Sequence, residues 1–431
     1  MKKFSGTTLI LTGIIVVLAV ILVGVLLFMR NLPSAQRGVT PIVQVKAMEA
    51  DSSIWGENFP NQYSTFLQTE TNATRTTYGG SVPFEKLDAD PMLRTLFAGM
   101  AFSKGYGEDR GHMNALTDVR NTPRLSEKTP ATCYSCKSAD NPALWASMGM
   151  AAYDALSFKQ MSDKISHSIG CANCHEAGTM RLIVTNPALD EALKAQGKDW
   201  RTFTRQEMRT VVCANCHVEY YFKKEGNYLT FPWEKGTRVE DMEAYYDEIG
   251  FSDWTHPASG AAMIKMQHPD YELYTAGSTH YNAGVSCADC HMPYTRDGAA
   301  KFSNHNVQSP LVNPAASCGT CHTDVDYVVG RVNIIQKNVH DTMMATEKAL
   351  VAAIEAIQKA AEAPGADTAK IEEARKLHRA AQLRWDYIAA ENSMGFHNSQ
   401  EALRILAAAT DLARQAELKA YQAVNTASAS R

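Results

Sequence analysis

The sequence predicts a mainly α-helical protein with little β-structure and with long helices at its C-terminal end. From about residue 331, apolar residues recur three, four or seven positions apart, which places them on one face of a helix. Residues 36–330 are instead rich in Gly, Pro, Tyr and Trp, which is typical of loops and short helices. We therefore expect three parts: an N-terminal segment (1–35), a central region (36–330) and a long-helix region (331–431).

The N-terminal segment contains an uninterrupted apolar stretch. Residues 4–29 carry no charge. At about 1.5 Å per residue, a helix over residues 8–29 can cross a hydrocarbon core of roughly 30 Å. Lys2 and Lys3 precede the stretch, which favours an N-terminus in the cytoplasm. We expect an uncleaved membrane anchor at residues 8–29 and an extracytoplasmic protein, periplasmic or on the outer face of the cytoplasmic membrane.

A cleaved signal peptide is the alternative for this segment, and it implies the same compartment. Signal peptides usually have a shorter apolar region, of about 7 to 15 residues, and small residues at positions −3 and −1. The best cleavage site lies after Ala35, and it has Pro33 at position −3. This mismatch favours the anchor.

All ten cysteines fall into CxxC pairs, and four of the five pairs are followed directly by histidine. With 13 His in 431 positions, chance placement at four given sites has a probability on the order of 10⁻⁶, and CxxCH is the attachment pattern of c-type haem. Zinc or disulfides are the alternative, but neither needs His at that one position. The pairs are Cys133/Cys136, Cys171/Cys174, Cys213/Cys216, Cys287/Cys290 and Cys318/Cys321, and the histidines are His175, His217, His291 and His322.

The spacing of these motifs suits haem attachment. Residues three apart share a helix face, so two thiols can bond the two vinyl groups while the next side chain points at the iron. A haem with two His ligands passes electrons but has no open position. We therefore expect a multihaem cytochrome c whose central region has a haem-packed core, in which most haems carry electrons.

The first pair differs from the others because Lys137 stands where they have histidine. A lysine amine binds iron only when it is deprotonated, and desolvation against the porphyrin would favour that form. An iron with this ligand and an empty opposite face can bind substrate. A mutated or unoccupied attachment site is the alternative.

Nine histidines lie outside the CxxCH sites, and four haems with two His ligands each would require four of them. Composition does not choose among them, and a surface or hydrogen-bonded core role is the alternative for each. They are His112, His167, His256, His268, His280, His305, His340, His378 and His397.

The C-terminal region contains three helical patterns. The first is ended by Pro364 and Gly365, and the third begins at Asn398 with Glu401 three residues later, as in a capping box. A helix of about 30 residues spans roughly 45 Å, longer than the radius of a compact domain. We expect part of its apolar face to form a homodimer interface, with packing inside one chain as the alternative. The apolar positions of the first helix are Val332, Ile335, Val339, Met343, Leu350, Ile354 and Ile357.

Charge argues against nucleic acid as a partner. The formal net charge is −4, and the sequence has no long basic or acidic block.

In combination, these motifs closely resemble ammonia-forming cytochrome c nitrite reductase, from about residue 50 to the C-terminus. The resemblance rests on one CxxCK site followed by four CxxCH sites, and on several further segments. These are Arg110-Gly111-His112, Asn121-Thr122-Pro123-Arg124, Cys216-His217-Val218-Glu219-Tyr220-Tyr221-Phe222, Phe231-Pro232-Trp233, Lys265-Met266-Gln267-His268-Pro269 and Asn392-Ser393-Met394-Gly395-Phe396-His397.

The resemblance implies an oxidoreductase that reduces nitrite to ammonium with six electrons at the lysine-ligated haem, supplied through the other four haems. It implies that Lys137 is the proximal ligand of the active haem and that Arg124, Tyr220 and His268 surround its open face. It also assigns the distal ligands, in order of haem attachment: His305 for the second haem, His112 for the third, His397 for the fourth and His280 for the fifth.

The resemblance further implies five covalently attached haem c groups and one calcium ion per chain. Glu219, Gln267 and the backbone carbonyls of Tyr220 and Lys265 resemble the calcium ligands of the family, and oxygen ligands suit that hard ion. The electron donor implied is a quinol-oxidising membrane cytochrome or another carrier.

The chemistry of the implied pocket is consistent with nitrite reduction. Cationic Arg124 and a protonatable His268 would attract the anion and stabilise charge as N–O bonds break. The reference pKa of histidine, near about 6.5, suits a general acid at neutral pH, and Tyr220 can donate a hydrogen bond.

Two alternatives stay open at this point. One is a pure electron carrier in which Lys137 only tunes a potential and a sixth ligand closes that haem. The other is the same enzyme class acting on hydroxylamine, nitric oxide or sulfite.

Overall fold

The structure is a computed structural model that describes residues 6–31, 41–107 and 110–429, with side chains at 11–25, 41–107 and 110–424. The chain divides into two compact units, Met1–Gln44 and Val45–Arg431. The boundaries expected from the sequence, at residues 35 and 330, stay a prediction.

In its described residues the first unit contains one helix, α1 (Gly6–Asn31), which covers the expected anchor at residues 8–29. Its described side chains, 11–25, are exposed. Among the helices in the described part of the chain, none is both long and apolar enough to cross a membrane.

The first part of the second unit is built from short helices. Because isolated helices of this length are marginal in water, they depend on caps and on packing. Ser157 and Thr204 each form a capping box, with Gln160 and Glu207. The α-helices are α2 (Ser52–Asn58), α3 (Pro60–Thr71), α4 (Lys86–Ala89), α5 (Leu93–Leu96), α6 (Ala115–Asn121), α7 (Asn141–Met148), α8 (Met150–Asp154), α9 (Phe158–Ser162), α10 (Pro187–Ala195), α11 (Arg205–Val211), α12 (Val239–Glu248), α13 (Asp270–Thr275), α14 (Thr279–Asn282), α15 (Cys287–His291) and α16 (Pro314–Ser317).

Short 3₁₀ helices connect these elements. The 3₁₀ helices are η1 (Ala101–Ser103), η2 (His112–Asn114), η3 (Ala131–Tyr134), η4 (Cys171–Asn173), η5 (Trp200–Thr202), η6 (Val212–Asn215), η7 (Pro310–Val312) and η8 (Phe396–Asn398). Three of them, η3, η4 and η6, coincide with attachment motifs. The 3₁₀ form suits such single turns because it is rarely stable in longer runs.

The β-structure among the described residues consists of four antiparallel pairs. In the longest pair, Tyr294 lies opposite Ser303. A two-stranded hairpin is marginal alone in water, so these pairs depend on the helices around them. The pairs are β1 (Arg75–Thr76) with β2 (Gly79–Gly80), β3 (Tyr221–Phe222) with β4 (Leu229–Thr230), β5 (Trp254–Thr255) with β6 (Ala262–Met263), and β7 (Tyr294–Asp297) with β8 (Ala300–Ser303).

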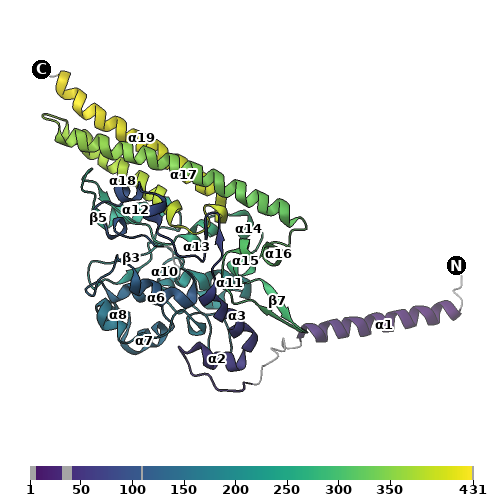
Figure 1. Cartoon of the computed structure of the whole chain (residues 1–431). Coiled ribbons are helices and arrows are strands. Elements are labelled where there is room, and N and C mark those ends of the chain that lie inside the picture. The colour runs from purple at the N-terminus through teal and green to yellow at the C-terminus, as the bar shows by residue number, and fades with distance from the viewer. Residues whose placement is uncertain (1–5, 32–40, 108–109, 430–431) are drawn as a thin grey trace. The chain divides into compact units, whose positions relative to one another are not determined.

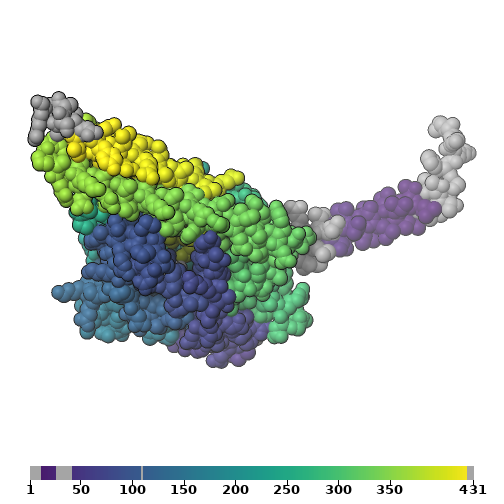
Figure 2. All heavy atoms as spheres, turned by 45° about the horizontal axis from the view of Figure 1, so that its top comes forward, coloured from purple at the N-terminus to yellow at the C-terminus, as the bar shows by residue number. Residues whose placement is uncertain are grey.

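Three long helices complete the unit: α17 (Val325–Glu362), α18 (Thr368–Ala390) and α19 (Ser399–Ala429), drawn in green to yellow in Figure 1. They lie side by side and form a continuous layer along one side of the short helices (Figures 1 and 2). The expected fold class, mainly α with long C-terminal helices and little β-structure, is confirmed.

The starts of α17 and α19 differ in detail from those expected from the sequence. Helix α17 begins at Val325, six residues before the expected start, because Asp324 caps it by accepting a hydrogen bond from the Tyr327 amide at 2.9 Å. Helix α19 has half of the expected capping box. Asn398 accepts from the Glu401 amide at 3.4 Å, but the Glu401 carboxylate pairs with Arg404 instead.

Two hydrophobic cores support the unit. The larger core joins the short helices to α17, α18 and the first half of α19. The smaller one lies between the far ends of the long helices and consists mainly of alanine, which lets the helices approach closely. The buried alanines of this smaller core are Ala353, Ala356, Ala360, Ala374, Ala416, Ala420 and Ala423.

Candidate haem sites and the lysine-containing pocket

The attachment motifs fold as single helical turns. In three of them the His amide donates to the carbonyl of the first cysteine: His175 to Cys171 at 3.0 Å, and the equivalent bonds of His217 and His322 at 2.9 Å. His291 ends α15, which begins at Cys287. The histidine therefore lies one turn after the first thiol.

The turn at Lys137 is tighter than the others. Its amide donates to the carbonyl of Tyr134 at 2.9 Å, three residues back rather than four. Lys137 therefore differs from the attachment histidines in its backbone hydrogen bond as well as in residue type.

The thiols place the attachment turns next to one another. No disulfide joins any of the ten cysteines, all of which lie in the described residues. The thiols of Cys136 and Cys216 lie close enough to shift each other's pKa, and the thiol of Cys213 raises the pKa of Cys287 in the same way. Burial raises the pKa of the Cys290 thiol to about 12, and the nearby thiol of Cys318 adds to the shift. The first, third, fourth and fifth turns thus follow one another in space.

One attachment thiol differs from the other nine in its surroundings. The side chain of Cys321 is exposed, whereas the other nine cysteines are half-buried. Its turn connects α16 to α17, and residues 319–324 are all exposed because little of the chain packs over this connection. Cys321 therefore lies at the edge of the unit. Covalent attachment of haem at Cys321 stays a prediction.

Histidines that are distant in sequence pair at a spacing that fits haem. An imidazole nitrogen binds a metal at about 2 Å, and the ring centre lies about 1.1 Å behind it, so two rings on one ion have centres about 6.2 Å apart. The observed centroid distances are 6.3 Å for His175 and His305, 6.3 Å for His280 and His322, and 6.4 Å for His291 and His397.

The third attachment histidine, His217, has two histidine neighbours. Burial lowers the pKa of His112 to about 4, and nearby His217 and Lys137 add to the shift. The ring of His268 lies 6.4 Å from that of His217. The family resemblance implies that His112 binds this haem and that His268 lies in the pocket, and both residues lie near His217.

In three of the proposed axial histidines, a hydrogen bond at Nδ1 leaves Nε2 available to bind a metal. Nδ1 of His175 contacts the Met180 carbonyl at 3.0 Å, and Nδ1 of His291 contacts the Gln308 carbonyl at 2.9 Å. Nδ1 of His305 contacts the Ser303 carbonyl at 2.8 Å. A carbonyl oxygen only accepts, so each Nδ1 carries the hydrogen and the Nε2 lone pair is available as a ligand. The residues present therefore fit haem iron.

The expected pocket residues gather near the first attachment turn. Burial raises the pKa of the Cys133 thiol to about 12, and the nearby cations Arg124 and Lys137 oppose the shift. Burial also holds the pKa of Tyr220 well above 10, with nearby Cys136 and Cys133 adding to the shift and Arg124 opposing it. The phenol therefore stays protonated and can donate a hydrogen bond.

Arg124 is held by an aromatic bracket. Its guanidinium carbon lies 4.4 Å from the ring centre of Phe102 and 5.9 Å from that of Tyr106, and Nη1 donates to the Gly105 carbonyl at 3.4 Å. Stacking of this kind orients a guanidinium while leaving other N–H groups available.

The expected calcium ligands lie around a buried carboxylate. Glu219 is fully buried, and it accepts hydrogen bonds from the Gln267 amide at 2.6 Å and from Tyr246 at 2.8 Å. Burial and the neighbouring carboxyls of Glu272 and Asp253 raise its pKa well above 4.5. A cation would remove this penalty, and the side-chain amide of Gln267 donates to the Lys265 carbonyl at 3.1 Å, so these two groups lie close together. The donor set therefore fits calcium.

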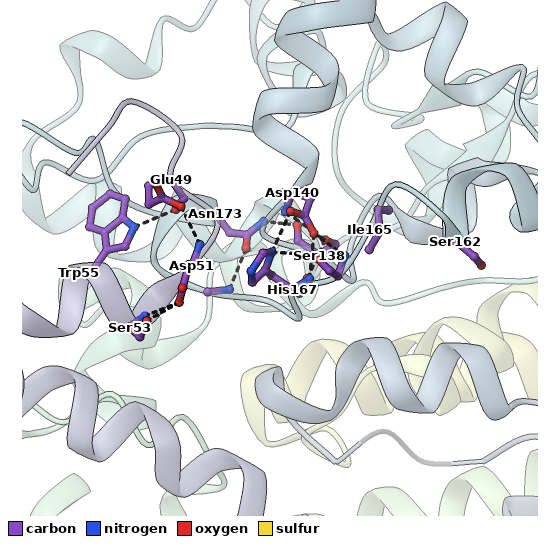
Figure 3. A network of polar contacts seen from close by, with 12 residues as sticks. Glu49, Asp51, Ser53, Trp55, Ser138, Asp140, Ser162, Ile165, His167 and Asn173 are labelled. Carbon is purple, nitrogen blue, oxygen red and sulfur yellow. Dashed lines mark hydrogen bonds and ion pairs between the residues drawn. The ribbon is translucent and has the colours of Figure 1, made fainter.

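A polar network joins the first and second attachment turns (Figure 3). Ser138, next to Lys137, donates to Asp140 and accepts through its carbonyl from Asn173, which lies between Cys171 and Cys174. Asp140 accepts from the amide of His167 and lies 2.9 Å from its Nδ1. His167 thus has a structural contact that the sequence did not indicate.

Three further histidines lie apart from these sites. His256 and His378 are buried, with ring centres 5.6 Å apart, and Ser259 bridges them through its amide and hydroxyl. His340 packs against Tyr78. They act as packing and hydrogen-bonding groups.

Asp270 was not singled out from the sequence, although it contacts two of the expected ligands, His217 and His397. The available signal was its position two residues after His268.

The fold and these sites define a multihaem c-type cytochrome. The family model described as "Cytochrome c552" matches residues 51–431, and the chain belongs to that family.

Individual relatives support the expected resemblance. A cytochrome c-552 of Parabacteroides distasonis is 43% identical over 383 residues, covering 87% of this chain and 77% of that protein. The cytochrome c nitrite reductase subunit NrfA of Nitratidesulfovibrio vulgaris is 39% identical over 420 residues, covering 88% and 80%.

A solved structure agrees with these relatives. Cytochrome c nitrite reductase from Desulfovibrio desulfuricans, a catalytic subunit described with two calcium sites, matches with a TM-score of 0.84 and 36% identity, covering 90% of this chain and 88% of that one. The predicted resemblance to cytochrome c nitrite reductase and the expected oxidoreductase class are confirmed.

Proposed function

We propose that this protein reduces nitrite to ammonium with six electrons at a haem ligated by Lys137, and that four haems with two His ligands each deliver the electrons. The main support for the proposal is a difference between the first attachment turn and the others. Lys137 occupies a tighter turn, beside Arg124 and Tyr220. In contrast, His175, His291 and His322 each lie opposite a second histidine. Bound haem supplies an iron that accepts electrons one at a time and that can bind nitrite on a free face.

The pocket side chains supply charge and protons. Arg124, oriented by Phe102, attracts the anion and stabilises negative charge on its oxygens. Each oxygen leaves as water, so protons must arrive with the electrons. His268 is the proposed general acid, and the protonated phenol of Tyr220 donates a hydrogen bond to the bound molecule.

The proposed cofactors are five haem c groups, one for each CxxC pair, and one calcium ion per chain. The succession of adjacent turns supports relay of electrons between haems, and the exposed position of Cys321 makes the fifth haem the candidate entry point for electrons from a donor. The buried charge of Glu219 supports the calcium ion, which would hold the segments around Tyr220 and His268 in place.

We propose that the protein lies outside the cytoplasm because covalent haem attachment at CxxCH motifs is typical of exported cytochromes. The proposed electron donor is a quinol-oxidising membrane cytochrome or another carrier.

The anchor at residues 8–29 stays a prediction. Recovery of the protein in the membrane fraction, and its release by deletion of these residues, would support the anchor. Recovery of the intact chain in the soluble extracytoplasmic fraction would contradict it.

The long helices support the proposed homodimer. Helix α17 has 38 residues and spans about 57 Å. Tyr327 and Ile334 on α17, and Leu418 and Tyr421 on α19, are exposed. Light scattering of the haem-loaded chain should give twice its mass, and a monomer at micromolar concentration would contradict the dimer.

The experiment that tests the function compares the haem-loaded protein with its Lys137→His variant, using a reduced dye as electron donor. We expect stoichiometric ammonium from nitrite, and a strong loss in the variant while its haem content is unchanged. No ammonium from a native protein with five reducible haems would favour an electron carrier. Specificity constants for hydroxylamine, nitric oxide and sulfite would rank the substrates.

A further inference from the structure

Asp270, at the start of α13, connects two of the proposed axial histidines. Its Oδ2 lies 3.0 Å from Nδ1 of His217, and its Oδ1 lies 3.5 Å from Nδ1 of His397. The carboxylate is buried, with 8% of the side chain exposed. One carboxylate thus faces ligands proposed for the third- and fourth-attached haems.

Neighbouring groups fix this arrangement. Asn392 donates its backbone amide to Oδ1 at 2.7 Å and its side-chain amide to Oδ2 at 3.0 Å. Glu391 lies 3.2 Å from Nδ1 of His397 and forms no ion pair with another proposed ligand among the described residues. Asp270 thus forms a hydrogen bond with His217 and a charge contact with His397, whereas Glu391 contacts His397 alone.

The other ligands differ in the charge of their partners. Nδ1 of His175, His291 and His305 contacts neutral backbone carbonyls. A carboxylate is a stronger acceptor, and it makes Nε2 a more basic ligand. A more basic ligand and a nearby negative charge both stabilise the oxidised iron, which carries the larger positive charge.

We propose that Asp270 is a shared positioning residue that fixes the ring of His217 by a hydrogen bond and that, through its negative charge beside both His217 and His397, lowers the reduction potentials of the third- and fourth-attached haems together. The inference rests on the proposed axial ligands. The thiols of Cys213 and Cys287 are in contact, so the two affected haems belong to adjacent turns. Electrons would pass through them as a matched pair.

The test is an EPR-monitored redox titration of the full haem-loaded chain carrying Asp270→Asn, with Glu391→Gln as the matched control. Asp270→Asn should raise the potentials of two haems, and Glu391→Gln should raise only one of these two. The haem between His175 and His305 should not move in either variant. A shift of one haem or none with Asp270→Asn, or an equal shift of all haems, would overturn the proposal.

The ring planes help to assign the signals. They cross at 34° for His175 and His305, 61° for His291 and His397, and 81° for His280 and His322. The EPR spectrum of low-spin ferric haem depends on this angle. If the native protein lacks the four signals of haems with two His ligands, the proposed ligands fail and the inference fails with them. If those signals are present and do not shift, only the role of Asp270 fails.

A second variant should shift the reduction potential in the opposite direction, and it preserves the charge of Asp270. Asn392→Ala removes one donor to Oδ2, so that oxygen accepts more strongly from His217. The potential of the third-attached haem should then fall. The mass of the intact chain measures covalent haem content, and equal content shows that each variant has assembled. An unchanged or raised potential of the third-attached haem in Asn392→Ala would count against the proposal.

Discussion

Two regions of the second unit, residues 45–324 and residues 325–429, are stabilised in different ways. In the described part of the first, no α-helix exceeds 12 residues and no strand exceeds four, and polar contacts join segments far apart in sequence. In the second, three helices of 38, 23 and 31 residues pack through their own apolar faces. The long helices therefore form one core among themselves and share a larger one with the short helices, whereas the short-helix region also depends on polar contacts between distant segments.

The largest expected effect is loss of the third attachment turn. Its thiols contact those of the first and fourth turns, so it lies at the centre of the succession. Replacing Cys213 and Cys216 with serine should prevent accumulation of a folded chain, and immunoblots with haem staining would measure this. A folded, four-haem protein would show that the short-helix region does not depend on its cofactors.

The pocket should be more sensitive in turnover than in assembly. His268→Asn removes the proposed proton donor, and general acid catalysis typically contributes about 10²- to 10⁴-fold. We expect nitrite turnover to fall by about 100-fold or more with all five haems attached. Arg124→Gln should also lower turnover, and unchanged rates in both variants would reject these pocket roles.

The two regions also differ in how far the sequence predicts them. Apolar periodicity predicts α17 but misses its first turn, where Asp324 rather than an apolar pattern sets the start. The attachment turns are evident from their motifs, but a motif does not report burial, so the exposure of Cys321 was not foreseen. The pairing of His175 with His305, 130 positions away, followed only from family resemblance, because tertiary folding brings them together. Asp270 was missed because a single carboxylate has no local signature.

Calcium removal should affect the short-helix region selectively. Glu219 is buried and lacks a fixed cation among its hydrogen-bond partners, which are the Gln267 amide and Tyr246. Chelation should lower nitrite turnover, and added calcium should restore it. Glu219→Gln should lower turnover without rescue by calcium. Helical circular dichroism should change little in both cases, since none of the proposed calcium ligands lies on the long helices.

In the long-helix region we expect a moderate and purely thermodynamic effect. Ile357 is fully buried on α17 in the smaller core, and Ile→Ala in a core typically costs about 2–5 kcal/mol. Ile357→Ala should lower the free energy of unfolding by this amount and leave haem content and turnover at native levels. A loss of haem would show that the two regions are not independent.

The smallest effect concerns pH. Burial, with nearby His256 adding to the effect, lowers the pKa of His378 to about 3, so it stays neutral in the folded chain while the unfolded chain takes up a proton below about pH 6.5. Its contribution to stability is present above pH 6.5 and is lost as pH falls towards 3. In His378→Asn, stability should fall less steeply between pH 6.5 and 4. Equal slopes in both proteins would contradict this.

The most direct test of the central claim, one open haem among four closed ones, is titration of the oxidised protein with nitrite while optical and EPR spectra are recorded. The account predicts that one equivalent of nitrite per chain changes one haem and leaves four low-spin signals intact. Absence of any change, or changes at two or more haems, would contradict it.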